Sequence, residues 1–116
     1  MGHHAFDEVM KGLPEGDTGF AGVQTWNMDA PDHQVVFFKA VGDVEVPEHS
    51  HSCKQWGVVL EGEMQLTVDG KTTQYKKGDS YYIPPDAPHS GRAKAGGFAI
   101  DFFDTPGRHK TLPRRP

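Results

Sequence analysis

Residues 42–62 read GDVEVPEHSHSCKQWGVVLEG, and the segments on either side are arranged around this stretch. It contains two histidines one residue apart, His49 and His51, followed four residues later by Gln55. Because successive side chains of a β-strand point to opposite faces, two histidines at this spacing are expected to point the same way. Their imidazoles and the amide oxygen of Gln55 are therefore candidate ligands for one metal ion.

A second stretch, residues 78–89, reads GDSYYIPPDAPH and ends in a third histidine, His89, just after a proline-rich turn. Three imidazoles and one oxygen donor suit a divalent transition metal, namely Zn, Ni, Fe, Mn or Cu, with one or two positions open for water or substrate. The alternative is that His49, His51, Gln55 and His89 only form hydrogen bonds near the surface. The joint spacing of the four residues favours the metal site.

Hydrophobic periodicity predicts short strands along most of the chain. The segment 64–68 alternates apolar and polar residues, as a half-buried strand does. Asp69-Gly70 follows it and is a strong hairpin signal, because both residues tolerate a positive φ. The predicted strands are 20–28, 33–41, 44–46, 56–60, 64–68, 71–75, 80–83, 89–92 and 98–103. Strands that recur every eight to twelve residues or so, with no helical period between them, predict an all-β sandwich or barrel.

Composition restricts the class of protein further. The chain has 116 residues, 35% of them hydrophobic, which is enough for one globular domain with a core. The net charge of −4 provides no general attraction to nucleic acid or to an anionic membrane, so neither is an expected partner. The sequence contains neither an apolar run long enough for a membrane-spanning helix nor the apolar region of a signal peptide. The single cysteine, Cys53, cannot form an internal disulfide, so a reducing, cytoplasmic setting is expected.

The two stretches resemble the two motifs of the cupin superfamily. They read His49-x-His51-x3-Gln55-x6-Gly62 and Gly78-x5-Pro84-x-Asp86-x2-His89. Gln55 stands where glutamate is commoner, and Asp86 stands where glycine is usual, although aspartate tolerates such turn conformations. The resemblance implies a small double-stranded β-helix, or jelly-roll, barrel with the site in its mouth. It also implies a homodimer formed through the sheets, to which the apolar strand at 35–41 and the N-terminal arm are expected to contribute.

The same resemblance suggests how the chain is divided. We expect an N-terminal arm over residues 1–17, the cupin barrel over 18–105 and a basic tail over 106–116. The tail has four basic residues and is interrupted by prolines, and it lacks the pattern of a buried strand.

From residue 57 to residue 108 the sequence resembles, more narrowly, the small cupins of pectin and alginate degradation that open the ring of 4,5-unsaturated uronates. In that family three histidines and a glutamine hold the metal. The last strand carries an aspartate, a phenylalanine two residues later, and an arginine after a proline turn. These positions correspond to Asp101, Phe103 and Arg108. The resemblance implies that Asp101 moves a proton, that Phe103 binds substrate and that Arg108 pairs with the substrate carboxylate. Tyr82 is a further candidate for substrate binding.

The strand pattern alone leaves two orientations open for Asp101. It shares a face of its strand with Phe103, and if that face lines the barrel, Asp101 is a buried acid near a cation. The opposite face carries Phe98, Ile100 and Phe102, a larger apolar set, which slightly favours the reverse orientation with Asp101 at the surface.

The leading hypothesis is a metal-dependent enzyme that acts on a small carboxylated sugar, as in the conversion of a 4,5-unsaturated uronate to a linear keto acid. Gln55 is neutral where glutamate would be anionic, so the ion keeps a larger positive charge, which favours acid–base chemistry over oxygenation. One alternative is a metal-dependent cupin dioxygenase, which would consume oxygen. Another is a non-catalytic module that binds a sugar or small acid and is stabilised by it without turnover.

Overall fold

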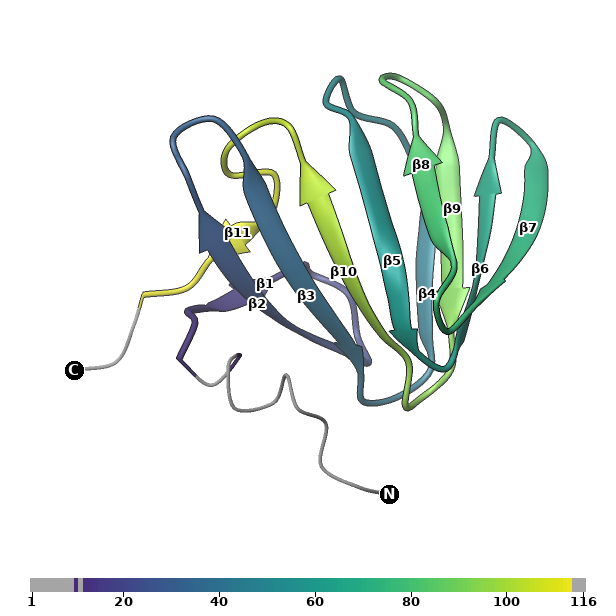
Figure 1. The fold of residues 1–116 in the computed structure, drawn as a ribbon, viewed down its shortest axis with the longest axis horizontal. Coiled ribbons are helices and arrows are strands. Elements are labelled where there is room, and N and C mark those ends of the chain that lie inside the picture. Colours follow the sequence, from purple (N-terminus) through teal and green to yellow (C-terminus); the bar gives the residue numbers. More distant parts are fainter. Residues whose placement is uncertain (1–9, 11, 114–116) are drawn as a thin grey trace.

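The computed structural model describes Met10 and residues 12–113. The other residues of the predicted arm, 1–9 and 11, and the end of the predicted tail, 114–116, lie outside this part of the chain. The described residues form two antiparallel sheets, of seven and four strands, which make up the barrel (Figure 1). The predicted all-β class is therefore confirmed. Within the same residues, no helix has the length and apolar character needed to cross a membrane.

Hydrogen bonding sets the order of the strands in each sheet. The larger sheet runs in the order β11 (Lys110–Thr111), β1 (Glu15–Asp17), β2 (Val23–Asp29), β3 (Gln34–Ala40), β10 (Phe98–Phe103), β5 (Gln55–Glu61) and β8 (Ser80–Ile83). The smaller sheet runs in the order β4 (Val44–His49), β9 (His89–Ala93), β6 (Glu63–Val68) and β7 (Lys71–Lys76). Strands far apart in the sequence, such as β3 and β10, are thus neighbours.

The turn chemistry at Asp69-Gly70 acts as predicted. Asp69 and Gly70 have φ values of 50° and 79°, and they join β6 to β7 in a hairpin. The pairing of Val68 with Lys71 encloses a loop of two residues, for which positive φ at both positions matches the twist of the flanking strands.

Two short strands were not predicted. Strand β1 lies within the predicted arm and β11 within the predicted tail, and the two pair at the edge of the larger sheet. Neither has a hydrophobic period, because each is only two or three residues long. The division of the chain at residues 17 and 105 stays a prediction, although both flanks contribute strands to the sheet.

The interior of the barrel and the outer face of the larger sheet each carry apolar side chains. Inside, one cluster of buried residues comprises Val59, Leu66, Tyr81, Ile83 and Ala87. Outside, Met10 packs with Phe37 and Phe98, so the end of the arm covers part of the sheet's outer face. This outer cluster explains why the predicted strands have apolar residues on both faces.

Strand β10 presents Asp101 to the barrel interior. The carboxyl group is only 5% exposed and lines the interior cavity together with Ala99, whereas Ile100 and Phe102 lie on the partly exposed outer face. The alternative orientation, with Asp101 at the surface, is therefore wrong. The larger apolar set on the opposite face reflects the outer cluster, which the strand pattern does not distinguish from a core.

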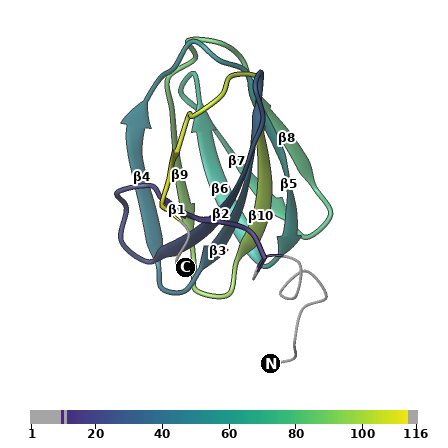
Figure 2. The same cartoon turned by 90° about the vertical axis from the view of Figure 1, so that its left-hand side faces the viewer.

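The fold brings the predicted ligands to one end of the barrel. His49 ends β4 and is paired with His89, which begins β9, while Gln55 begins β5 and is paired with Phe103 at the end of β10. His51 follows β4 and does not belong to a strand. The prediction that strand alternation points His49 and His51 the same way is therefore wrong. The two rings are nevertheless neighbours. Figure 2 shows the connecting loops gathered at the two ends of the barrel.

Candidate metal centre

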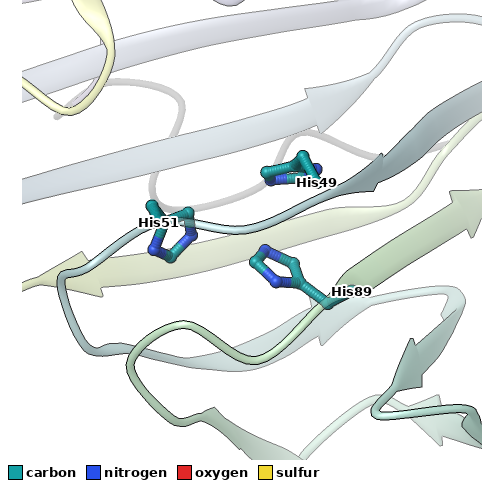
Figure 3. A group of neighbouring side chains, drawn as sticks. All are labelled: His49, His51 and His89. Atoms are coloured by element: carbon teal, nitrogen blue, oxygen red, sulfur yellow. The ribbon is translucent and has the colours of Figure 1, made fainter.

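Three imidazoles converge at the end of the barrel where β4 and β9 meet. One ligand nitrogen from each of His49, His51 and His89 lies within 4.8 Å of the other two. The ring centroids of His49 and His89 are 4.2 Å apart, and those of His51 and His89 are 4.8 Å apart (Figure 3). Since a divalent metal binds each nitrogen at about 2.1 Å, ligand nitrogens of one site lie up to about 4.2 Å apart. The cluster is thus close to the dimensions of a metal site.

Backbone carbonyls fix the orientation of all three rings. Nδ1 of His49 lies 2.9 Å from the Pro47 carbonyl oxygen, and Nδ1 of His89 lies 2.8 Å from that of Ala87. Nδ1 of His51 is 3.0 Å from the Cys53 carbonyl oxygen. Nδ1 of His51 also lies 3.3 Å from the Cys53 sulfur and its Nε2 lies near Gln55, so the contacts of His51 fit both tautomers. A carbonyl can only accept, so neutral His49 and His89 carry the proton on Nδ1 and keep a free lone pair on Nε2. This is the tautomer that a histidine uses to bind a metal through Nε2.

His89 is the most buried of the three histidines. It is 4% exposed, and its Nε2 is buried with no hydrogen-bond partner among the described residues. A buried, unpaired polar atom is costly unless another ligand satisfies it. Burial is the main cause that lowers the pKa of His89. The hydrogen bond to the Ala87 carbonyl opposes this shift, and the positive charge of Arg108 adds to it. The imidazole is therefore kept neutral, as metal binding requires.

Gln55 provides an oxygen beside the imidazoles. Its Oε1 lies 3.1 Å from Nε2 of His51. In the Nδ1–H tautomer of His51, which is the one that binds a metal through Nε2, both of these atoms are acceptors, and two lone pairs facing each other repel. A shared cation would convert this repulsion into two bonds. The donor set of three neutral nitrogens and one amide oxygen thus fits a divalent transition metal.

Asp101 lies next to this group and is hydrogen bonded on two sides. The Tyr81 hydroxyl donates to its Oδ1, and Gln55 also forms a side-chain hydrogen bond with it. Burial raises the pKa of Asp101 to about 7, against the two hydrogen bonds, which lower it. Burial likewise raises the pKa of Tyr81, so the phenol keeps its proton and acts as the donor.

The tail places Arg108 and His109 at the same cavity. Gln34, which is fully buried, accepts from the His109 backbone N–H at 2.9 Å and donates to the His109 carbonyl at 2.8 Å. Asn27 donates to the Lys110 carbonyl at 3.1 Å, which holds the next residue. These bonds attach the tail to the inner face of β2 and β3. Nε of Arg108 is buried and has no hydrogen-bond partner among the described residues, so it is available to an anionic ligand.

His109 was missed by reasoning from the sequence. It lines the cavity, and its ring packs edge-on against Phe103 and Phe38 at centroid distances of 5.2 and 5.6 Å. Burial is the main cause that lowers its pKa to about 4, and the charge of Arg108 adds to the effect. The tail has no hydrophobic period that could have indicated this burial.

The predicted substrate-binding residues lie in three different environments. Arg108 lines the interior cavity, which has a volume of about 130 Å³ and is also lined by His49, Gln55, His89 and Asp101. Phe103 is 1% exposed and packs behind His51 at a ring distance of 6.1 Å. Tyr82 is 53% exposed and pairs with Trp56 across β8 and β5, so it is not brought together with the histidine cluster.

A family model described as "Cupin domain" matches residues 36–102, more than half of the chain. The chain therefore belongs to the cupin family, and the predicted jelly-roll barrel is confirmed. A solved structure of an RmlC-like cupin from Shewanella frigidimarina NCIMB 400 is similar to it, with 28% identity and a TM-score of 0.74. That similarity covers 93% of this chain and 94% of the other.

Two further relatives are similar to the chain. KdgF from Halomonas sp. has 25% identity and a TM-score of 0.66, with 81% of each chain covered. The uncharacterized protein MJ1618 of Methanocaldococcus jannaschii is 35% identical over 49 residues, or 42% of this chain. Those residues make up 39% of MJ1618, so the chain matches well under half of that relative's length.

Proposed function

We propose that this cupin is a metal-dependent enzyme that acts on a small carboxylated sugar and converts a 4,5-unsaturated uronate to a linear keto acid. The observation that carries the proposal is the convergence of three imidazoles, each with Nδ1 beside a backbone carbonyl, next to a buried carboxyl group and an unpaired arginine nitrogen. A divalent ion held by His49, His51, Gln55 and His89 would supply positive charge that binds and acidifies a substrate oxygen. The similarity to KdgF supports the resemblance to pectin-degradation cupins.

The ring opening is an isomerisation in which atoms and charges balance. Asp101, as a carboxylate, accepts the proton of the C1 hydroxyl while the C1 carbonyl forms and the C1–O5 bond breaks. The electron pair moves through O5 and C5 to C4, Asp101 returns the proton to C4 and is again a carboxylate, and C5 becomes a ketone. The burial of Asp101 supports this role, because a proton exchanged inside the barrel is shielded from bulk water.

Arg108 is proposed to bind the substrate carboxylate through its guanidinium group. Replacing Arg108 with lysine keeps the charge but removes the planar pair of donors. The loss of one charge-assisted hydrogen bond, about 1.5–3 kcal/mol, is expected to raise KM for unsaturated galacturonate about 10- to 100-fold with little change in kcat. Steady-state kinetics of the metal-loaded enzyme measures both constants.

The matched control is Arg92→Lys, at the opposite end of β9, where Arg92 Nε lies 3.4 Å from an oxygen of Glu45 at the surface. It is expected to leave KM unchanged. Equal KM values for Arg108→Lys and wild type would remove Arg108 from substrate binding.

We also propose that the protein is a homodimer in a reducing, cytoplasmic setting, with Cys53 as a free thiol. The homodimer is supported by an apolar row across the outer face of the larger sheet, where Trp56 is 41% and Tyr82 53% exposed. Trp56 stacks on Phe102 of the neighbouring strand at 5.8 Å and an interplanar angle of 14°. A two-fold interface buries the same patch of both subunits, so this exposed aromatic patch would be covered by its own copy.

Trp56→Glu is expected to convert the dimer to a monomer, because a charge would have to be buried in the interface. Size-exclusion chromatography with light scattering should show the mass fall from two chains to one. Gln74→Glu adds the same charge on β7 of the other sheet and should leave the mass unchanged. A dimer that survives Trp56→Glu would exclude this face as the interface.

A further inference from the structure

Three residues that lie in one row of the larger sheet form an arrangement that the sequence motifs do not reveal. Asp101 on β10 is paired with Gly57 on β5, and Gly57 is paired with Tyr81 on β8. Since neighbouring strands are about 4.8 Å apart, the backbones of Asp101 and Tyr81 are about 10 Å apart. The Tyr81 hydroxyl nevertheless donates to Oδ1 of Asp101, so the tyrosine side chain reaches across the glycine.

Gly57 provides the space for this contact. A Cβ atom at position 57 would lie 2.6 Å from the Tyr81 hydroxyl oxygen and would also meet Oδ1 of Asp101. Both of these contacts would be shorter than any that a real Cβ atom makes. A glycine inside a strand normally weakens it and often marks a place where another group approaches closely. Here the approaching groups are the Tyr81 hydroxyl, the Asp101 carboxylate and the backbone carbonyl of Ile100.

The Asp101 carboxylate in turn orients the amide of Gln55. Gln55 and Gly57 lie on the same face of β5, and Gly57 is paired with Asp101, so Gln55 is a diagonal neighbour of Asp101 across the two strands. The side-chain hydrogen bond that lowers the pKa of Asp101 is donated by the amide nitrogen, the only donor of a glutamine side chain. With its nitrogen bound to Asp101, Gln55 turns its oxygen towards the histidines, 3.1 Å from Nε2 of His51. In the flipped orientation the amide oxygen would face the carboxylate, and two acceptors would repel each other.

We propose that Tyr81 is a positioning residue for the metal centre, which acts through Asp101 to keep the oxygen of Gln55 directed at the ion. This inference rests on the metal site of the proposed function and adds to it a chain of three side chains, Tyr81, Asp101 and Gln55. Because Tyr81 and Asp101 are only 6% and 5% exposed, water does not readily replace either partner. Loss of the hydroxyl therefore leaves the carboxylate free to turn and the amide free to flip.

The test is a titration of metal-free protein with Co²⁺, whose visible absorption reports the number and type of ligands. Tyr81→Phe removes one oxygen atom and keeps the ring. It is expected to weaken Co²⁺ binding about 10- to 100-fold, the usual cost of losing a group that orients a ligand, and to change the absorption spectrum. Tyr75→Phe is the matched control. Its ring contacts that of Tyr81 at 5.5 Å, and it should bind Co²⁺ as the wild type does.

A second background separates positioning from a general effect on packing. In Gln55→Ala protein there is no amide to orient, so adding Tyr81→Phe should weaken Co²⁺ binding no further and leave the spectrum unchanged. A further loss in this background would assign Tyr81 a merely structural role and overturn the inference. Unchanged binding and spectrum in Tyr81→Phe alone would overturn it as well.

The wild-type protein distinguishes failure of this inference from failure of the proposed function. If the wild type binds no Co²⁺, the metal centre is absent, and the proposed function falls with the inference. If it binds Co²⁺ but Tyr81→Phe matches it, only the inference falls. Should Tyr81→Phe not fold, NMR of the metal-free wild type supplies the test. One side-chain amide proton of Gln55 should be protected from exchange, whereas rapid exchange of both would overturn the inference.

Discussion

Replacement of His49 with alanine is expected to remove the bound metal from this protein. The wild type should retain about one equivalent of a divalent transition metal after purification, or after loading and desalting, and His49→Ala should retain none. The reason is geometric. His49 supplies one of only three imidazoles in the cluster, its ring is held at Nδ1 by the Pro47 carbonyl, and removal leaves two imidazoles and a neutral amide. Elemental analysis measures the metal content directly.

The matched control is His33→Ala. His33 lies in a turn, exposed and hydrogen bonded to Asp32 at 2.8 Å, so its loss should leave the metal content unchanged. Both variants keep His3 and His4, so any ion bound by those residues is the same in each sample. Equal metal content in His49→Ala and wild type, or a wild type that stays metal-free after loading, would contradict the site.

Replacement of Asp101 with asparagine is expected to slow turnover of unsaturated galacturonate about 10²- to 10⁴-fold when both proteins are loaded to the same metal content. Asparagine has nearly the same shape but cannot accept the proton of the substrate hydroxyl. Asp101 is not among the predicted ligands, but it orients Gln55, so the rates are compared between samples that contain equal amounts of bound metal. Loss of the ultraviolet absorbance of the substrate double bond follows the reaction, and elemental analysis of the same sample accounts for the metal.

Asp69→Asn is the control for this substitution. Asp69 lies in the exposed hairpin turn with φ of 50°, which asparagine also tolerates, so both stability and rate should be unchanged. Full activity of metal-loaded Asp101→Asn would exclude Asp101 as the proton-transfer group. Consumption of oxygen by the iron- or copper-loaded wild type, absent with zinc, would instead favour the dioxygenase. Binding that raises the melting temperature without turnover would favour a non-catalytic module.

Much of this architecture follows from local patterns. Alternation of apolar and polar residues at 64–68 and the Asp69-Gly70 turn predict β6, β7 and their hairpin, because turn geometry and side-chain periodicity are properties of a few adjacent residues. The candidate ligands are likewise identified from short motifs, by the spacing of His49, His51, Gln55 and His89. The motifs begin and end strands, and the jelly-roll topology brings those strand ends together.

Contacts between distant segments determine two features that the local patterns do not predict, the orientation of Asp101 and the burial of the tail. The orientation of Asp101 depends on the outer layer formed by Met10 and Phe37, which makes both faces of β10 apolar. The burial of Arg108 and His109 depends on hydrogen bonds from Gln34 and Asn27, some 75 or more residues earlier in the chain.

The contact between Tyr81 and Asp101 depends on a glycine in the strand between them, and no single segment contains all three residues. Residue types and spacings therefore determine the family, the strands and the candidate ligands. The protonation and orientation of the groups around those ligands depend on burial and on partners across the sheet, which are set only when the two sheets close into a barrel.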